Sequence, residues 1–114
     1  MICVVTYNEE SGIHRFVGAA DNVGFLRDSH HHRFVIKTWI RVSHEDREVE
    51  VLTRQREISE FLREEYGSPC QFGGMSCETI ARRVMEFCGD KCVKVQVLED
   101  GYGGAEVSRE FESA

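Results

Sequence analysis

The sequence has a single proline and no long run of apolar residues among its 114 positions. A helix that crosses a membrane needs about 20 consecutive apolar residues, so the sequence predicts no such helix. The first residues, MICVVTY, also lack the basic flank and the apolar length of a signal peptide. We therefore expect a soluble, cytoplasmic protein with no membrane partner.

A basic cluster is also missing, because 14 lysines and arginines are outnumbered by 20 aspartates and glutamates and stand singly along the chain. The formal net charge is −6. Contacts with phosphate groups need a basic surface, and this composition does not supply one. The sequence therefore predicts no nucleic-acid partner.

Paired cysteines are absent, since the five cysteines are odd in number and none follows the CxxC spacing of a structural zinc site. They are Cys3, Cys70, Cys77, Cys88 and Cys92. We expect reduced thiols that pack as small apolar side chains. One alternative stays open: Cys88 and Cys92, at a predicted helix end and strand start, could form a redox pair.

Short segments in which apolar and polar residues alternate predict strands, and the chain length suits one domain over residues 1–114. The predicted strands cover residues 2–7, 13–20, 30–42, 47–51, 92–99 and an edge strand within 101–111. Turn residues at 8–12 and 43–46 would join the first four strands into two hairpins.

Two other segments repeat apolar residues every three or four positions, which is the spacing of one helix face. The first predicted helix covers residues 54–66 after the cap Thr53, and the second runs from the cap Ser76 to Gly89. Hairpins without alternating strand and helix units indicate an antiparallel sheet with two helices packed on one face. The predicted fold class is α+β.

Three consecutive histidines begin the longest predicted strand, DSHHHRFVIKTWIRV, at residues 28–42. Neighbouring side chains of a strand point to opposite faces, so His30 and His32 share the apolar face of Phe34 and Ile36. Two imidazoles on one face can reach a common zinc ion. The alternative is a hydrogen-bonded pair without a metal.

Glu99 ends the last long strand on the face of Val93, Val95 and Val97, where the pattern expects an apolar residue. Burying a carboxylate without a partner is costly, so we expect a bonding partner, a shifted pKa or an exposed strand end. The isolated His14 and His44 are expected to be ordinary strand or surface residues.

Four segments, taken in order, resemble motifs of one enzyme family. GAADN at 18–22 is similar to its AAH segment, HHHRF at 30–34 to its HGHNY, MSCETIARRV at 75–84 to its PTSEN helix start, and VKVQVLED at 93–100 to its glutamate-bearing strand. These motifs belong to the 6-pyruvoyl- and 6-carboxy-tetrahydropterin synthases, and the chain resembles a divergent member over roughly residues 14–107. The resemblance implies the T-fold.

The resemblance also implies a set of site residues. Zinc or another divalent metal would be held by His30, His32 and Asp21, and the heterocyclic substrate would contact Glu99, Ser76, Cys77 and Glu78. Each has a simpler explanation as well. Asp21 suits a turn, Ser76 a helix cap, and Glu78 the first turn of a helix, where the helix dipole favours an acidic side chain.

Several family features are missing from the chain. Asp21 stands where the family has its third histidine, residues 21–29 contain no cysteine, and residues 53–75 contain no match to the catalytic Asp-His pair. The residues that could replace the general base are His31, Asp28 and His44.

The implied function is a metal-dependent lyase or isomerase that acts on a pterin, a deazapurine or a related heterocycle. The alternatives are a catalytically degenerate protein that binds a nucleotide-like ligand without turnover, and a structural oligomer. Family sites lie between subunits, so the resemblance implies a homo-oligomer, a trimer or hexamer. Trp39, on the polar face of its strand, is expected at a buried contact.

Overall fold

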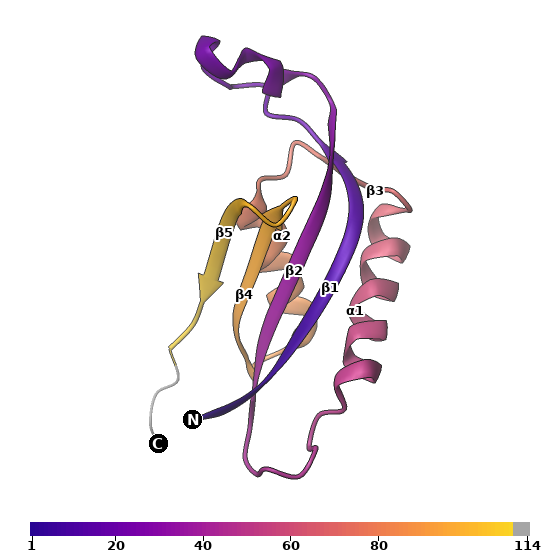
Figure 1. Cartoon of the computed structure of the whole chain (residues 1–114), viewed down its shortest axis with the longest axis vertical. Coiled ribbons are helices and arrows are strands. Elements are labelled where there is room, and N and C mark those ends of the chain that lie inside the picture. Colours follow the sequence, from indigo (N-terminus) through magenta and orange to yellow (C-terminus); the bar gives the residue numbers. More distant parts are fainter. Residues whose placement is uncertain (111–114) are drawn as a thin grey trace.

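Five strands form one mixed sheet in the computed structural model, which describes residues 1–110 (Figure 1). The elements are β1 (Ile2–His14), the 3-10 helix η1 (Asp21–Arg27), β2 (His30–Val42), α1 (Val51–Tyr66), β3 (Cys70–Gly73), α2 (Cys77–Cys88), β4 (Cys92–Glu99) and β5 (Gly103–Ser108). The strand order is β3-β1-β2-β4-β5. The predicted α+β class is confirmed.

One strand departs from the predicted antiparallel sheet. The short β3 lies in a segment that was expected to be a loop, and it pairs in parallel with the end of β1, from Gly12 opposite Cys70. The other neighbours in the sheet are antiparallel. The sheet is therefore mixed, and the prediction of a purely antiparallel sheet is wrong at this edge.

β1 and β2 form one long hairpin, paired without interruption from Ile2 opposite Val42 to His14 opposite His30. The predicted turn at 8–12 is wrong, because the strand continues through it. Asn8 and Glu10 are buried there and have partners on α1: Asn8 Nδ2 donates to Ser59 Oγ at 2.9 Å, and Ser59 Oγ donates to Glu10 Oε1 at 2.7 Å. These bonds offset the cost of burying polar groups.

The predicted strand at 47–51 is also wrong, since α1 begins at Val51. Its N-terminal cap is Glu50 instead of the expected Thr53. The Glu50 carboxylate accepts hydrogen bonds from Leu52 N at 3.0 Å and Thr53 N at 2.6 Å. These are free N–H groups of a first helical turn, so a carboxylate there fixes where the helix starts.

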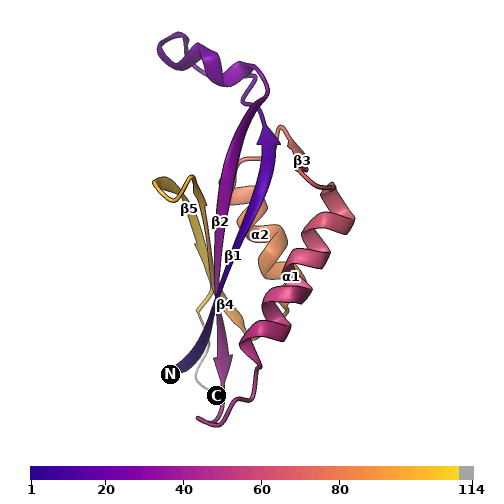
Figure 2. The same ribbon diagram turned by 45° about the vertical axis from the view of Figure 1, so that its right-hand side comes forward.

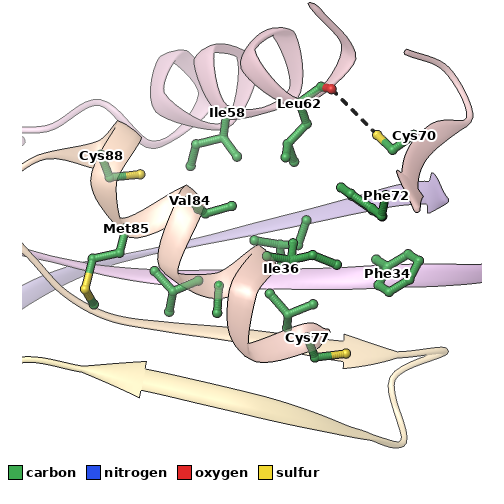
Figure 3. Packing of buried hydrophobic residues seen from close by; sticks show 14 of the residues in the cluster. Phe34, Ile36, Ile58, Leu62, Cys70, Phe72, Cys77, Val84, Met85 and Cys88 are labelled. Carbon is green, nitrogen blue, oxygen red and sulfur yellow. Dashed lines mark hydrogen bonds between the residues drawn. The ribbon is translucent and has the colours of Figure 1, made fainter. Parts of the chain in front are cut away.

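Both helices cover the same face of the sheet (Figure 2). Side chains of α1 and α2, such as Ile58, Leu62 and Val84, pack on Phe34 and Ile36 of β2 (Figure 3). No helix among the described residues is both long and apolar enough to cross a membrane.

The connection between β1 and β2 extends beyond the end of the sheet and carries η1 (Figure 1). Arg27 holds this connection together: its Nε and Nη2 donate to Ala19 O at 2.9 and 2.7 Å, and Nη2 also pairs with Asp21 Oδ1 at 2.6 Å. The two ends of the connection are the last residue of β1 and the first residue of β2. Those residues are His14 and His30.

Candidate metal centre

Three imidazole rings meet where β1 ends and β2 begins. The ring centroids of His14 and His30 lie 4.6 Å apart, those of His30 and His32 4.9 Å, and those of His14 and His32 5.3 Å. One nitrogen of each ring lies within 4.8 Å of the others. His30 and His32 point to the helix-covered face, as the alternation of β2 predicts. His14 joins them because it is paired with His30 in the hairpin.

The Nδ1 atoms of all three rings are occupied by oxygen acceptors. The partners are Met75 O at 3.1 Å from His14, Asp28 O at 2.9 Å from His30, and Asp100 Oδ2 at 2.7 Å from His32. Carbonyl and carboxylate oxygens only accept hydrogen bonds, so each neutral ring carries its hydrogen on Nδ1. Each Nε2 therefore keeps its lone pair, which is the arrangement found in metal-binding histidines.

The Nε2 atom of His32 is buried and has no hydrogen-bond partner among residues 1–110. It lies 3.1 Å from Glu99 Oε2, and His14 Nε2 lies 3.4 Å from Glu99 Oε1. If these rings are neutral with hydrogen on Nδ1, their Nε2 lone pairs face a carboxylate, and a cation between them would stabilise that arrangement. Burial lowers the pKa of His14 and favours its neutral form, which is the form that binds metals.

Aromatic rings form the floor beneath the histidines. The rings of His14 and His32 meet the Phe34 ring edge-on at 5.2 and 5.7 Å, and Phe34 packs on Phe72 at 5.0 Å. Gly12 lies next to this stack, and a Cβ atom there would come within 2.8 Å of both phenylalanine rings. The backbone at Gly12 therefore allows the floor to pack closely against the strand.

A pocket of about 540 Å³ opens from the histidines. His14, His30 and Glu99 line it, and Phe16 and Leu26 from the β1–β2 connection contribute apolar wall. Further lining comes from Met75, Ser76, Cys77 and Glu78 at the start of α2. The volume is in the usual range for sites that bind small molecules.

Cys77, the first residue of α2, contacts Glu99 from the pocket wall. Its Sγ donates to Glu99 Oε1 at 3.4 Å. Burial, followed by the nearby Glu99 carboxylate, raises the pKa of Cys77 to about 12. Cys77 is therefore a neutral thiol at neutral pH, which suits a hydrogen-bond donor and not a nucleophile.

The other residues expected to bind substrate have different surroundings. Ser76 is the N-terminal cap of α2, because its Oγ accepts from Thr79 N at 3.1 Å. Glu78 lines the pocket and is exposed. Glu99 is one-third exposed, with its two oxygens directed at the histidines and at Cys77. Glu78 and Glu99 are the carboxylates that line the described pocket.

Some expected site residues lie elsewhere. The Asp21 side chain is fully exposed and pairs with Arg27, so it does not join the histidines. His31 lies on the opposite strand face, bonded to Ser11 Oγ. Asp28 is exposed and reaches His30 through its backbone oxygen. None of these three side chains lines the described pocket, and neither does His44.

His14 was not predicted as a site residue, although two signals in the sequence indicate it. In an unbroken strand from Ile2, His14 shares a face with Asn8 and Glu10, and the register then places it opposite His30. The family motif AAH also ends in histidine, and His14 is the sole histidine before His30. The predicted turn at 8–12 concealed the first signal.

Comparison of the sequence with protein-family models finds no match. Comparison with curated proteins finds none either. The likeness to the tetrahydropterin synthases stays a prediction that rests on four short motifs.

Proposed function

We propose that this protein binds a divalent metal ion, zinc by the chemistry of its ligands, and holds a small heterocycle beside that ion. The ligands would be the Nε2 atoms of His14, His30 and His32. The observation that carries the proposal is that each Nδ1 atom is tied to an oxygen acceptor, while one ring nitrogen of each histidine lies within 4.8 Å of the others. Three imidazole ligands leave one position of a tetrahedral zinc ion open, as in catalytic zinc sites.

Glu99 is the proposed anchor for the heterocycle. A carboxylate can accept two parallel N–H bonds from an amino-pyrimidine edge, and this paired geometry is selective. Phe16, Leu26 and Met75 supply apolar wall suited to the faces of a flat ring. The proposed ligands are therefore a pterin, a deazapurine or a related heterocycle.

The proposed activity is a lyase or isomerase reaction on that heterocycle, in a T-fold protein related to the tetrahydropterin synthases. A bound metal would act as a Lewis acid toward oxygen atoms of the ligand. With Glu99 as the anchor, Glu78 is the carboxylate of the pocket that would move a proton, and the Cys77 thiol orients Glu99.

A second candidate, a binding protein without turnover, is favoured by the positions of the expected bases. His31 faces the other side of the sheet and the Asp28 side chain is outside the described pocket. The pocket could then hold the heterocycle without the proton transfers that a lyase needs. Incubation with dihydropterin substrates, followed by chromatography of the products, separates turnover from binding.

The proposed assembly is a closed homo-oligomer, a trimer or hexamer by resemblance. The sheet face opposite the helices supports it, because Val5 and Tyr7 there are 47% and 46% exposed. Val5 is paired with Trp39, whose ring lies under Lys94 Nζ at 4.5 Å. Large apolar side chains exposed together are typical of contacts between subunits. Light scattering coupled to size-exclusion chromatography measures the oligomeric state.

The metal proposal is tested by the zinc content of protein purified without a histidine tag, measured by plasma mass spectrometry. We expect about one zinc per chain in the wild type. His14→Ala should lose the zinc, and Asp21→Ala should keep it. Zinc lost from Asp21→Ala and kept in His14→Ala would show that Asp21, and not His14, is the third ligand.

If the wild type binds no zinc even when zinc is supplied, the metal site is refuted, and the histidines are then hydrogen-bonding partners of Glu99. Binding of a pterin, followed by its fluorescence, tests the anchor separately. Glu99→Gln should weaken pterin binding, because an amide cannot accept two N–H bonds in parallel.

A further inference from the structure

Asp100, in the turn between β4 and β5, is the one side chain among the three acceptors that hold the Nδ1 atoms. The other two acceptors are backbone carbonyls. Asp100 Oδ2 accepts from His32 Nδ1 at 2.7 Å, and Asp100 Oδ1 accepts from the backbone N of Arg33 at 2.9 Å. Each oxygen of this carboxylate therefore faces a donor.

The position of Asp100 is fixed by its own backbone. Asp100 N donates to Arg33 O at 2.8 Å, so backbone and side chain both bind the strand residue next to His32. Its φ is 55°, in the left-handed region that aspartate tolerates better than most residues. The carboxylate cannot turn away from His32 without breaking its bond to Arg33.

We propose that Asp100 is a positioning residue of the metal site, which fixes the tautomer of His32 and so presents a bare Nε2 to the metal. This inference rests on the proposed metal site and adds the residue that prepares one of its ligands. Carboxylates behind metal-binding histidines orient the ring and raise its basicity.

The substitution Asp100→Asn separates this role from a merely structural one. Asparagine has one oxygen and one NH₂ group, so it cannot accept from both donors through separate oxygens. The backbone N–H of Arg33 cannot change, whereas an imidazole can move its hydrogen from Nδ1 to Nε2. The asparagine oxygen should therefore face Arg33, and its NH₂ group should force His32 into the Nε2–H form. The same change behind the catalytic histidine of serine proteases produces the wrong tautomer.

An unusual order of metal affinities follows. Asp100→Ala removes the acceptor and leaves the tautomer free, so zinc affinity should fall about 10-fold. Asp100→Asn imposes the wrong tautomer, so zinc affinity should fall about 100-fold. If Asp100 only held the turn in place, the similarly shaped asparagine would be the milder change of the two.

The experiment measures zinc affinity by competition with a chromophoric chelator in the wild type and both variants. The matched control is Asp46→Asn, because Asp46 is exposed, pairs with Arg47 and contacts none of His14, His30 and His32; its backbone N donates to His44 Nδ1, a bond that the substitution leaves in place. Long-range ¹H–¹⁵N NMR of the metal-free proteins shows which nitrogen of His32 carries hydrogen. We expect Nδ1–H in the wild type and Nε2–H in Asp100→Asn.

Weaker zinc binding by Asp100→Asn than by Asp100→Ala, together with the tautomer change, supports the inference. Equal zinc affinity in the wild type and both variants overturns the role of Asp100 and leaves the metal site standing. A smaller loss of zinc affinity in Asp100→Asn than in Asp100→Ala also overturns the positioning role of Asp100. A wild type that binds no zinc refutes the metal site and this inference together. If Asp100→Ala does not fold, the NMR spectrum of Asp100→Asn still decides the tautomer.

Discussion

Gly12 can be tested as the residue that lets the aromatic floor lie against the sheet. In Gly12→Ala, the added methyl group would approach two ring carbons of Phe34 and one of Phe72 to 2.8 Å. Both rings are buried, at 0% and 2% exposure, so neither can turn into solvent. The substitution therefore overfills a closely packed part of the core.

The expected loss of stability follows from two opposing effects. Overpacking a core costs about 1–3 kcal/mol, and three contacts this short on buried rings place Gly12 in the upper part of that range. Replacing glycine lowers the entropy of the unfolded chain and returns about 0.4–1 kcal/mol. The net destabilisation should be about 2 kcal/mol. At about 2.1 cal/mol/K per residue, this lowers the Tm of a 114-residue chain by roughly 8 °C.

Urea unfolding followed by circular dichroism gives the free energy, and a thermal melt gives the Tm. Gly74→Ala is the control, because a Cβ atom there meets nothing within 4 Å. That variant should stay within about 0.5 kcal/mol of the wild type. A Gly12→Ala protein as stable as the wild type would refute the packing argument. A displaced Phe34 should also weaken zinc binding, since His14 and His32 rest on its ring.

Three further predictions concern helix caps and thiols. Ser76→Ala removes the side-chain cap of α2 and should cost about 1 kcal/mol in urea unfolding. The hydrogen bonds from Thr53 lower the pKa of Glu50 below its ordinary 4.5, so the ionised carboxylate stabilises the folded state. The difference in unfolding free energy between wild type and Glu50→Ala should be complete above pH 4.5 and shrink as the pH falls further. Iodoacetamide at pH 8 should label the half-exposed Cys3 and spare the buried Cys77, as seen by peptide mass spectrometry; equal labelling would contradict this.

Local alternation was enough to predict which face several site residues occupy. His30 and His32 share a side with Phe34 because β2 is a regular strand, and its period of two requires no distant information. The same reasoning placed Glu99 on the face of Val97, and the structure shows that this face lies beside the histidines. Cap and stop residues likewise predicted both ends of α2.

The misplaced elements depend on contacts between distant parts of the chain. The polar residues at 8–12 are typical of a turn, yet Asn8 and Glu10 lie in a strand because α1 provides their hydrogen-bond partners. The alternating residues 47–51 suggested a strand, and the cap interactions of the Glu50 carboxylate start a helix instead. β3 forms through its pairing with the end of β1, which no local pattern encodes.

The third imidazole was missed for a related reason. Matching GAADN to the AAH motif drew attention to Asp21, whose carboxylate pairs with Arg27 instead. His14 enters the site through the register of a hairpin that the turn-like residues had concealed. The Asp100 contact with His32 joins a turn to a strand 68 residues away and has no signature in either segment.

The pairing of His14 with His30 links metal binding to strand registration. Side chains of a strand change face at every residue, so a slip of β1 by one position would turn His14 to the opposite side of the sheet. An ion bound by both strands would thus stabilise the native register of β1 against β2 and no neighbouring register. At a free zinc concentration 100 times its Kd, zinc binding would stabilise the native register by about 2.7 kcal/mol. Metal binding would then favour the correct strand pairing in the β1–β2 hairpin.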